Sequence, residues 1–104
     1  MAEITPLKIN NPLVGKWTAS DGFSDVVVII SCELNKFQVS VLDQEDNEVA
    51  EVYDVRTENE ALLFNVHWPS TGRFVKYRFL ALHNGTVGVT YTYSGQDTWQ
   101  KLET

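Results

Sequence analysis

Turn-favouring residues interrupt this sequence at short intervals, and apolar and polar side chains alternate in the stretches of roughly six to nine residues between them. A period of two places the apolar side chains on one face of a β-strand and the polar ones on the other. We predict eight strands, at residues 14–20, 25–33, 37–42, 48–56, 61–68, 73–82, 86–93 and 96–102. The connections are too short for crossovers, so successive strands should pair antiparallel as a meander.

An up-and-down meander of this kind hides its two edge strands best by closing on itself. We therefore expect an all-β fold, an eight-stranded antiparallel up-and-down meander closed into a small barrel, with a two-sheet sandwich as the alternative. Residues 1–12, which contain Pro6 and Pro12, should form an extended leader. Residues 13–104 should form a single β-barrel domain.

The two ends of the chain carry a pattern that fits this closure. Gly15 and Trp17 are two residues apart, so they lie on one face of the first strand, and the glycine leaves room for another segment to cross the indole. Closure would bring Trp17 near Trp99 and Lys101. This combination resembles the lipocalin-like barrels of the calycin superfamily, in which a Gly-x-Trp on the first strand packs beneath a basic side chain near the end of the barrel. The resemblance implies that Trp17 is the floor, that Lys101 covers it, and that the barrel interior holds a small ligand.

The stretch from Leu13 to Thr18 is also similar to the opening of the avidins, which are calycins. Avidins bind biotin through polar side chains two and six residues after that tryptophan. Here these positions hold Ala19 and Phe23, so we predict no biotin site.

Composition excludes several classes of function. The formal net charge is −6, and the cluster of Arg73, Lys76 and Arg78 is too small to bind a phosphate backbone, so nucleic acid is disfavoured. No apolar run approaches the ~18 residues of a membrane span. The N-terminus lacks the pattern of a signal peptide and Cys32 is the single cysteine, which together favour a cytoplasmic protein with Cys32 packed in the core.

The second predicted strand is apolar on both faces, because residues 26–30 are five successive β-branched residues. Both faces should therefore be covered. Leu7 and Ile9 of the leader could cover one of them, and a second copy of the chain in a homodimer is the alternative.

Candidate chemical groups are few. Residues 43–54 have the length of a calcium-binding EF-hand loop, but Glu48 stands where that loop needs glycine, so we expect a solvated acidic face and no metal site. His67 and His83 have neither metal-ligand spacing nor a nucleophile elbow nearby, so we expect no enzyme, no catalytic residues and no cofactor. Glu51 shares a strand face with Tyr53, which would place its carboxylate inside the barrel or near its rim.

The aromatic residues lead to the functional hypothesis. Tyrosine and tryptophan bring polar groups into an apolar wall, which suits a small apolar or aromatic ligand. The ligand-binding residues that we expect are Trp17, Glu51, Tyr53, Phe64, Tyr77 and Tyr91. The same rings could instead fill the barrel, and the protein would then be a non-catalytic interaction or assembly module that acts as a homo-oligomer.

Overall fold

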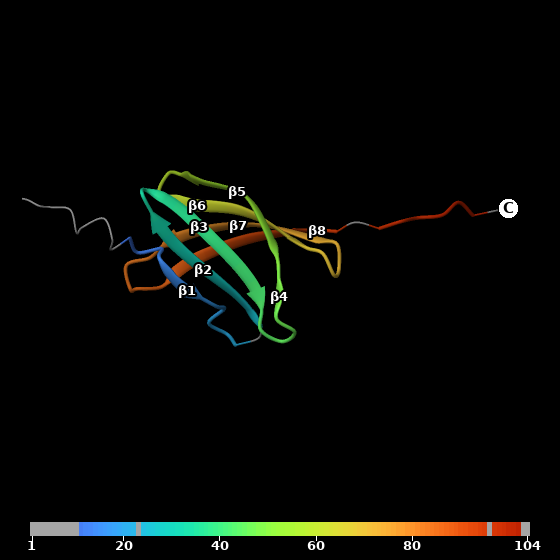
Figure 1. Cartoon of the computed structure of the whole chain (residues 1–104), viewed down its shortest axis with the longest axis horizontal. Coiled ribbons are helices and arrows are strands. Elements are labelled where there is room, and N and C mark those ends of the chain that lie inside the picture. The colour runs from blue at the N-terminus through green and yellow to red at the C-terminus, as the bar shows by residue number, and fades with distance from the viewer. Residues whose placement is uncertain (1–10, 23, 96, 103–104) are drawn as a thin grey trace, which may run out of the picture.

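The computed structural model describes residues 11–22, 24–95 and 97–102, which form eight antiparallel strands and no helix. The strands make two four-stranded sheets in the orders β1-β2-β3-β4 and β5-β6-β7-β8 (Figure 1). Their bounds are β1 Gly15–Trp17, β2 Val26–Glu33, β3 Lys36–Asp43, β4 Glu48–Val49, β5 Glu51–Glu58, β6 Ala61–Trp68, β7 Arg73–Ala81 and β8 Val87–Ser94. The prediction of an all-β antiparallel protein is confirmed. Among these described residues there is no helix that could cross a membrane.

The eight observed strands are not the eight predicted ones. The predicted strand at 48–56 is divided at Ala50, so that β4 belongs to the first sheet and β5 to the second. Ala50 is 6% exposed, and its amide donates a hydrogen bond to the Val41 carbonyl oxygen at 2.9 Å. One extended run thus turns the corner between the sheets.

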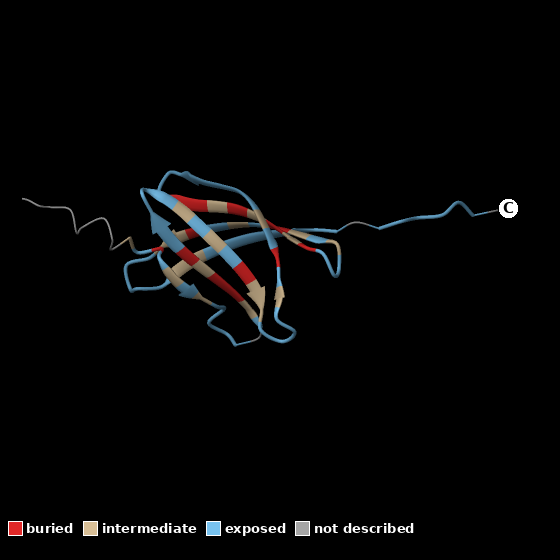
Figure 2. Ribbon diagram, viewed as in Figure 1, coloured by how far each residue is buried: buried red, intermediate tan, exposed pale blue. Residues whose placement is uncertain are grey.

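The core lies between the two sheets. Its members come from alternate positions of the long strands, as Figure 2 shows by the red bands on β2, β3 and β6. The largest side chains that are less than 2% exposed are Ile30, Val41, Leu62, Phe64, Val66 and Val75. Val27 on the other face of β2 is also buried, at 3%, although it is not part of this core. The predicted cover from Leu7 and Ile9 lies outside the described residues.

Two hairpins turn through pairs of residues with positive φ. These pairs are Leu34 with Asn35 and Asn59 with Glu60, and each joins strands that pair up to the residue before the turn. Asn84-Gly85 is a dipeptide typical of a type I′ hairpin turn, which needs positive φ at both residues. Only Gly85 has it, because pairing of β7 with β8 ends at Ala81 and Val87 and leaves a longer loop.

The two sheets are not closed on each other. β1 pairs with β2 alone and β8 with β7 alone among the described strands. Residues 97–102 form no strand and run away from the sheets beyond the end of β8 (Figure 1). The expected approach of Trp99 and Lys101 to Trp17 is therefore not seen. Cys32 is exposed, contrary to expectation, because its position near the β2–β3 hairpin lies beyond the covered part of the sheet.

Candidate functional site

A cleft of about 650 Å³ opens between the edge of the first sheet and strands β7 and β8 of the second. Binding sites for small molecules typically have volumes of roughly 300–1,000 Å³. The cleft exists because β1 stops at Trp17 and the chain then leaves the sheet, so that no described strand closes the space between β1 and β8. Its lining residues are Trp17, Thr18, Ala19, Ser20, Asp21, Ser24, Val26, Val28, Tyr77, Phe79, Thr86, Val87, Val89, Tyr91 and Tyr93.

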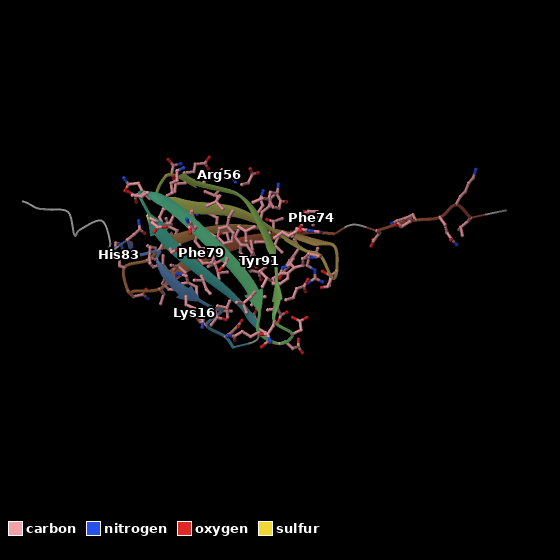
Figure 3. All side chains as sticks on the ribbon, viewed as in Figure 1. Lys16, Arg56, Phe74, Phe79, His83 and Tyr91 are labelled. Atoms are coloured by element: carbon pink, nitrogen blue, oxygen red, sulfur yellow. The ribbon has the colours of Figure 1, made fainter. Side chains whose placement is uncertain are left out.

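One wall of the cleft is aromatic. Tyr77 on β7 lies opposite Tyr91 on β8, and the centroids of their rings are 6.3 Å apart. Tyr93 follows on the same face of β8, with its ring edge-on to Tyr91 at 5.4 Å. Figure 3 labels Phe79 and Tyr91, two of the residues that line the cleft. The period of two along β8 thus lines up rings that one ligand could contact together.

The facing wall contains Trp17, whose indole is held by the segment just before β1. The indole Nε1–H donates to the Leu13 carbonyl oxygen at 2.8 Å. A Cβ on Gly15 would lie 3.6 Å from the indole, which is ordinary contact, so the glycine is not needed to provide space. Its φ of 152° is instead the reason for glycine, because side chains disfavour that backbone conformation.

Tyr77 is the most perturbed titratable group of the cleft. Removal from water, together with the smaller effects of the neighbouring Tyr93 and Tyr91, raises the pKa of Tyr77 to about 12. No described residue forms a hydrogen bond with the hydroxyl of Tyr77, Tyr91 or Tyr93. Tyr77 is half-buried and Tyr91 and Tyr93 are exposed, so these three hydroxyls are available to a ligand as donors and acceptors.

The cleft lacks a cation. Of the described residues that line it, Asp21 is the charged one, and none is lysine, arginine or histidine. Arg73 lies at the end of the wall, on the face of β7 that carries Tyr77, with its guanidinium carbon 5.3 Å from the centre of the Tyr93 ring. A ligand carboxylate or phosphate would find no opposite charge among these lining residues, so the cleft suits a neutral molecule.

The structure brings together three of the six residues predicted for the site. Trp17, Tyr77 and Tyr91 line the cleft. Phe64 is fully buried behind it and stacks on Tyr77, with centroids 5.2 Å apart. Glu51 and Tyr53 lie on the opposite face of the second sheet, because Val52 pairs with the buried Val66 and takes the inward position.

Sequence reasoning missed Tyr93 and the branched residues of β8 as part of the wall. The signal was present, since Val87, Val89, Tyr91 and Tyr93 alternate on one face. The alternation does not show that β8 is an edge strand, where such residues remain accessible.

Glu51 and His67 form a pair that the sequence analysis did not bring together. The two residues are directly opposite on β5 and β6, and His67 Nδ1 lies 2.7 Å from a Glu51 carboxylate oxygen. Phe74 stacks on the imidazole at 4.5 Å. A carboxylate that orients a histidine is one part of an acid–base site, but no nucleophile among the described residues is hydrogen-bonded to His67, and we assign no chemistry to the pair.

Three acidic side chains, Asp25, Asp43 and Glu45, gather at one end of the first sheet, with ligand atoms within 4.8 Å of one another. Exposed carboxylates often cluster in this way without a metal, and we assign no site to them.

Comparisons with models of protein families, with curated proteins and with solved structures gave no match to this chain.

Proposed function

We propose that this protein binds a neutral, planar aromatic molecule in the cleft between β1–β2 and β7–β8. The observation that carries the proposal is the wall of three tyrosines facing Trp17 across a space of about 650 Å³. Flat rings that enter this space would exchange water for aromatic contact, and stacked or edge-on pairs are worth ~0.5–1.5 kcal/mol each beyond the area that they bury.

The polar groups set the chemistry of the ligand. Three tyrosine hydroxyls without a partner among the described residues favour a molecule with carbonyl or amide groups on its rim. The absence of a cation from the described lining residues disfavours fatty acids and phosphorylated ligands. The calycin resemblance supports the binding of a small ligand, and it also implies that the two sheets close into a lipocalin-like barrel. The cleft could hold a ligand without this closure.

Matched flavins test the proposal. Lumiflavin is neutral and planar, and riboflavin phosphate carries the same ring system with an anionic tail. We expect stacking on the cleft to quench lumiflavin fluorescence with a dissociation constant below about 100 μM, and riboflavin phosphate to bind more weakly. Oleate serves as the lipidic anion and should not compete.

Two variants locate the binding. Tyr91→Ala removes a ring from the wall and should weaken lumiflavin about tenfold, which corresponds to ~1.4 kcal/mol. Tyr53→Ala removes a tyrosine from the opposite face and should leave the affinity unchanged. The proposal is wrong if lumiflavin fails to bind, or if both variants behave alike.

A further inference from the structure

Strand β8 has a long edge that none of the described strands covers. It is the last strand of its sheet, and its eight residues include no charge and no proline. Val89, Tyr91 and Tyr93 on it are 40%, 55% and 57% exposed. Natural sheets rarely leave such an edge bare, because its free amides and carbonyls can pair with another chain.

The other edges of the described sheets are protected. β5 carries Glu51, Asp54, Arg56 and Glu58 and is interrupted by a bulge between Tyr53 and Arg56. β1 has three residues and includes Lys16, and β4 has only two residues. Charges, bulges and short length are the usual devices against unwanted pairing. Their absence from β8 alone indicates that this edge has a partner.

The segment 97–102 is equally exposed. It continues from β8 away from both sheets (Figure 1), and Figure 2 shows it exposed throughout. Trp99 and Leu102 in it are 86% and 79% exposed. A tryptophan in this position contributes nothing to the core of its own chain, and a large apolar side chain held in water is typical of an interaction site.

We propose that two copies of the chain pair antiparallel through their β8 edges, and that the segment 97–102 of each copy lies along β8 of the other. A two-fold axis makes such a contact self-complementary. The proposal goes beyond the ligand-binding function and does not rest on it.

The period of two fixes which side chains would meet. Counting by two from Tyr91 through Tyr93, Gly95 and Asp97 leads to Trp99, so these positions share a face of an extended strand. In the register that places Gly95 on the two-fold axis, Trp99 lies opposite the partner's Tyr91. Trp99 then borders the partner's cleft.

The same register is complementary in charge. Asp97 would lie opposite the partner's Tyr93, and in each copy the Arg73 guanidinium carbon is 5.3 Å from the Tyr93 ring centre. The carboxylate would thus approach the guanidinium across one ring. Each chain has a net charge of −6, so local attraction of this kind is needed where two copies meet.

A second copy explains the segment better than its own chain does. The segment already runs in the direction that reaches a partner, whereas folding back would require a reversal after Ser94. A tight hairpin that pairs Ser94 with Asp97 would put Trp99 opposite Thr92, on the face away from the cleft.

The mass of the protein in solution is the first test. Light scattering on the full chain at tens of micromolar should give twice the chain mass of 11.8 kDa. Trp99→Ser should raise the dimer dissociation constant at least tenfold. Leu34→Ser, which replaces a residue that is 92% exposed in a different turn, should leave it unchanged. A monomer at 100 μM, or a dimer that is indifferent to Trp99→Ser, would overturn the proposal.

Cross-linking tests the register independently. In a Cys32→Ser background, Gly95→Cys places one thiol in each copy at the two-fold axis. The two thiols would then lie close enough to form a disulfide. We expect oxidation to give a covalent dimer rapidly, and Leu34→Cys in the same background to give little. Equal rates would show that β8 is not the interface. A monomer whose Trp99 fluorescence is shielded from iodide would show that the segment folds back on its own chain, which also overturns the proposal.

Discussion

Phe64 supports both the core and the cleft, and its replacement measures how far the two depend on each other. The ring is fully buried, stacks on Tyr77 at 5.2 Å and contacts Phe79 at 5.4 Å, and both of these neighbours line the cleft. Burial of a phenylalanine side chain contributes ~1.5–3 kcal/mol. Each aromatic pair adds ~0.5–1.5 kcal/mol. Phe64→Ala should therefore reduce the free energy of unfolding by about 3–5 kcal/mol, the range for large aromatic deletions.

This loss is a large part of the ~5–15 kcal/mol that stabilises a typical domain. Urea denaturation followed by circular dichroism should show a lower midpoint at an unchanged slope. Phe64→Leu keeps an apolar side chain but loses both ring contacts, so we expect a loss of about 1–2 kcal/mol. Tyr53→Ala, on the exposed outer face, should cost no more than about 1 kcal/mol. A loss below about 1 kcal/mol for Phe64→Ala would refute the assignment of this ring to the core.

Three further predictions concern single residues. Gly15→Ala should destabilise the fold by ~1–3 kcal/mol because of its φ of 152°, whereas Gly88→Ala, which meets only ordinary contacts, should be nearly neutral in the same urea titration. Tyr77 keeps its proton to about pH 12 when folded but loses it from its ordinary value of 10.0 when unfolded, so the stability that it contributes is complete below pH 10 and lost between pH 10 and 12. Tyr77→Phe should flatten that alkaline decline, and an unchanged decline would contradict the assignment. Glu51→Gln should change the unfolding free energy by less than about 1 kcal/mol, since 66% of the Glu51 side chain is exposed, and a loss above ~2 kcal/mol would contradict this.

The sequence predicts strands well where alternation is regular and both neighbours are long. The range 61–68 is recovered without error as β6, and its apolar positions Leu62, Phe64, Val66 and Trp68 are all buried. In such strands the face that the alternation predicts to be apolar is the face that the fold buries, so the local pattern predicts the buried residues correctly.

The pattern fails where the tertiary partner decides. Val49 and Tyr53 outweigh Ala50 and Val52 in size, which suggested that their face, and Glu51 with it, points inward. Pairing of Val52 with Val66 reverses this, and Val49 and Tyr53 are 64% and 43% exposed. Register with a neighbouring strand, rather than the apolar content of one strand, determines the buried face.

Closure of the sheets could not be derived from alternation either. Residues 97–102 include Thr98 and Trp99, which favour strands, but strand propensity reflects packing against neighbours, and the described structure offers this segment none in its own chain. Three of the residues that line the cleft were nevertheless predictable as neighbours, because Trp17, Tyr77 and Tyr91 are aromatic residues on inward faces whether the sheets close or remain open.

Strand β8 joins the two proposals, because one of its faces forms the cleft wall and its free edge would meet the second copy. Tyr91 contacts the ligand in one proposal and Trp99 of the partner in the other. Ligand binding and dimer formation would therefore order the same ring. Thermodynamic linkage then requires that a ligand which strengthens pairing is itself bound more tightly by the dimer, and by the same factor. We expect saturating lumiflavin to lower the dimer dissociation constant several-fold, measured by analytical ultracentrifugation, and the effect to disappear in Tyr91→Ala. An unchanged dissociation constant in the presence of bound lumiflavin would show that the wall and the edge of β8 act independently.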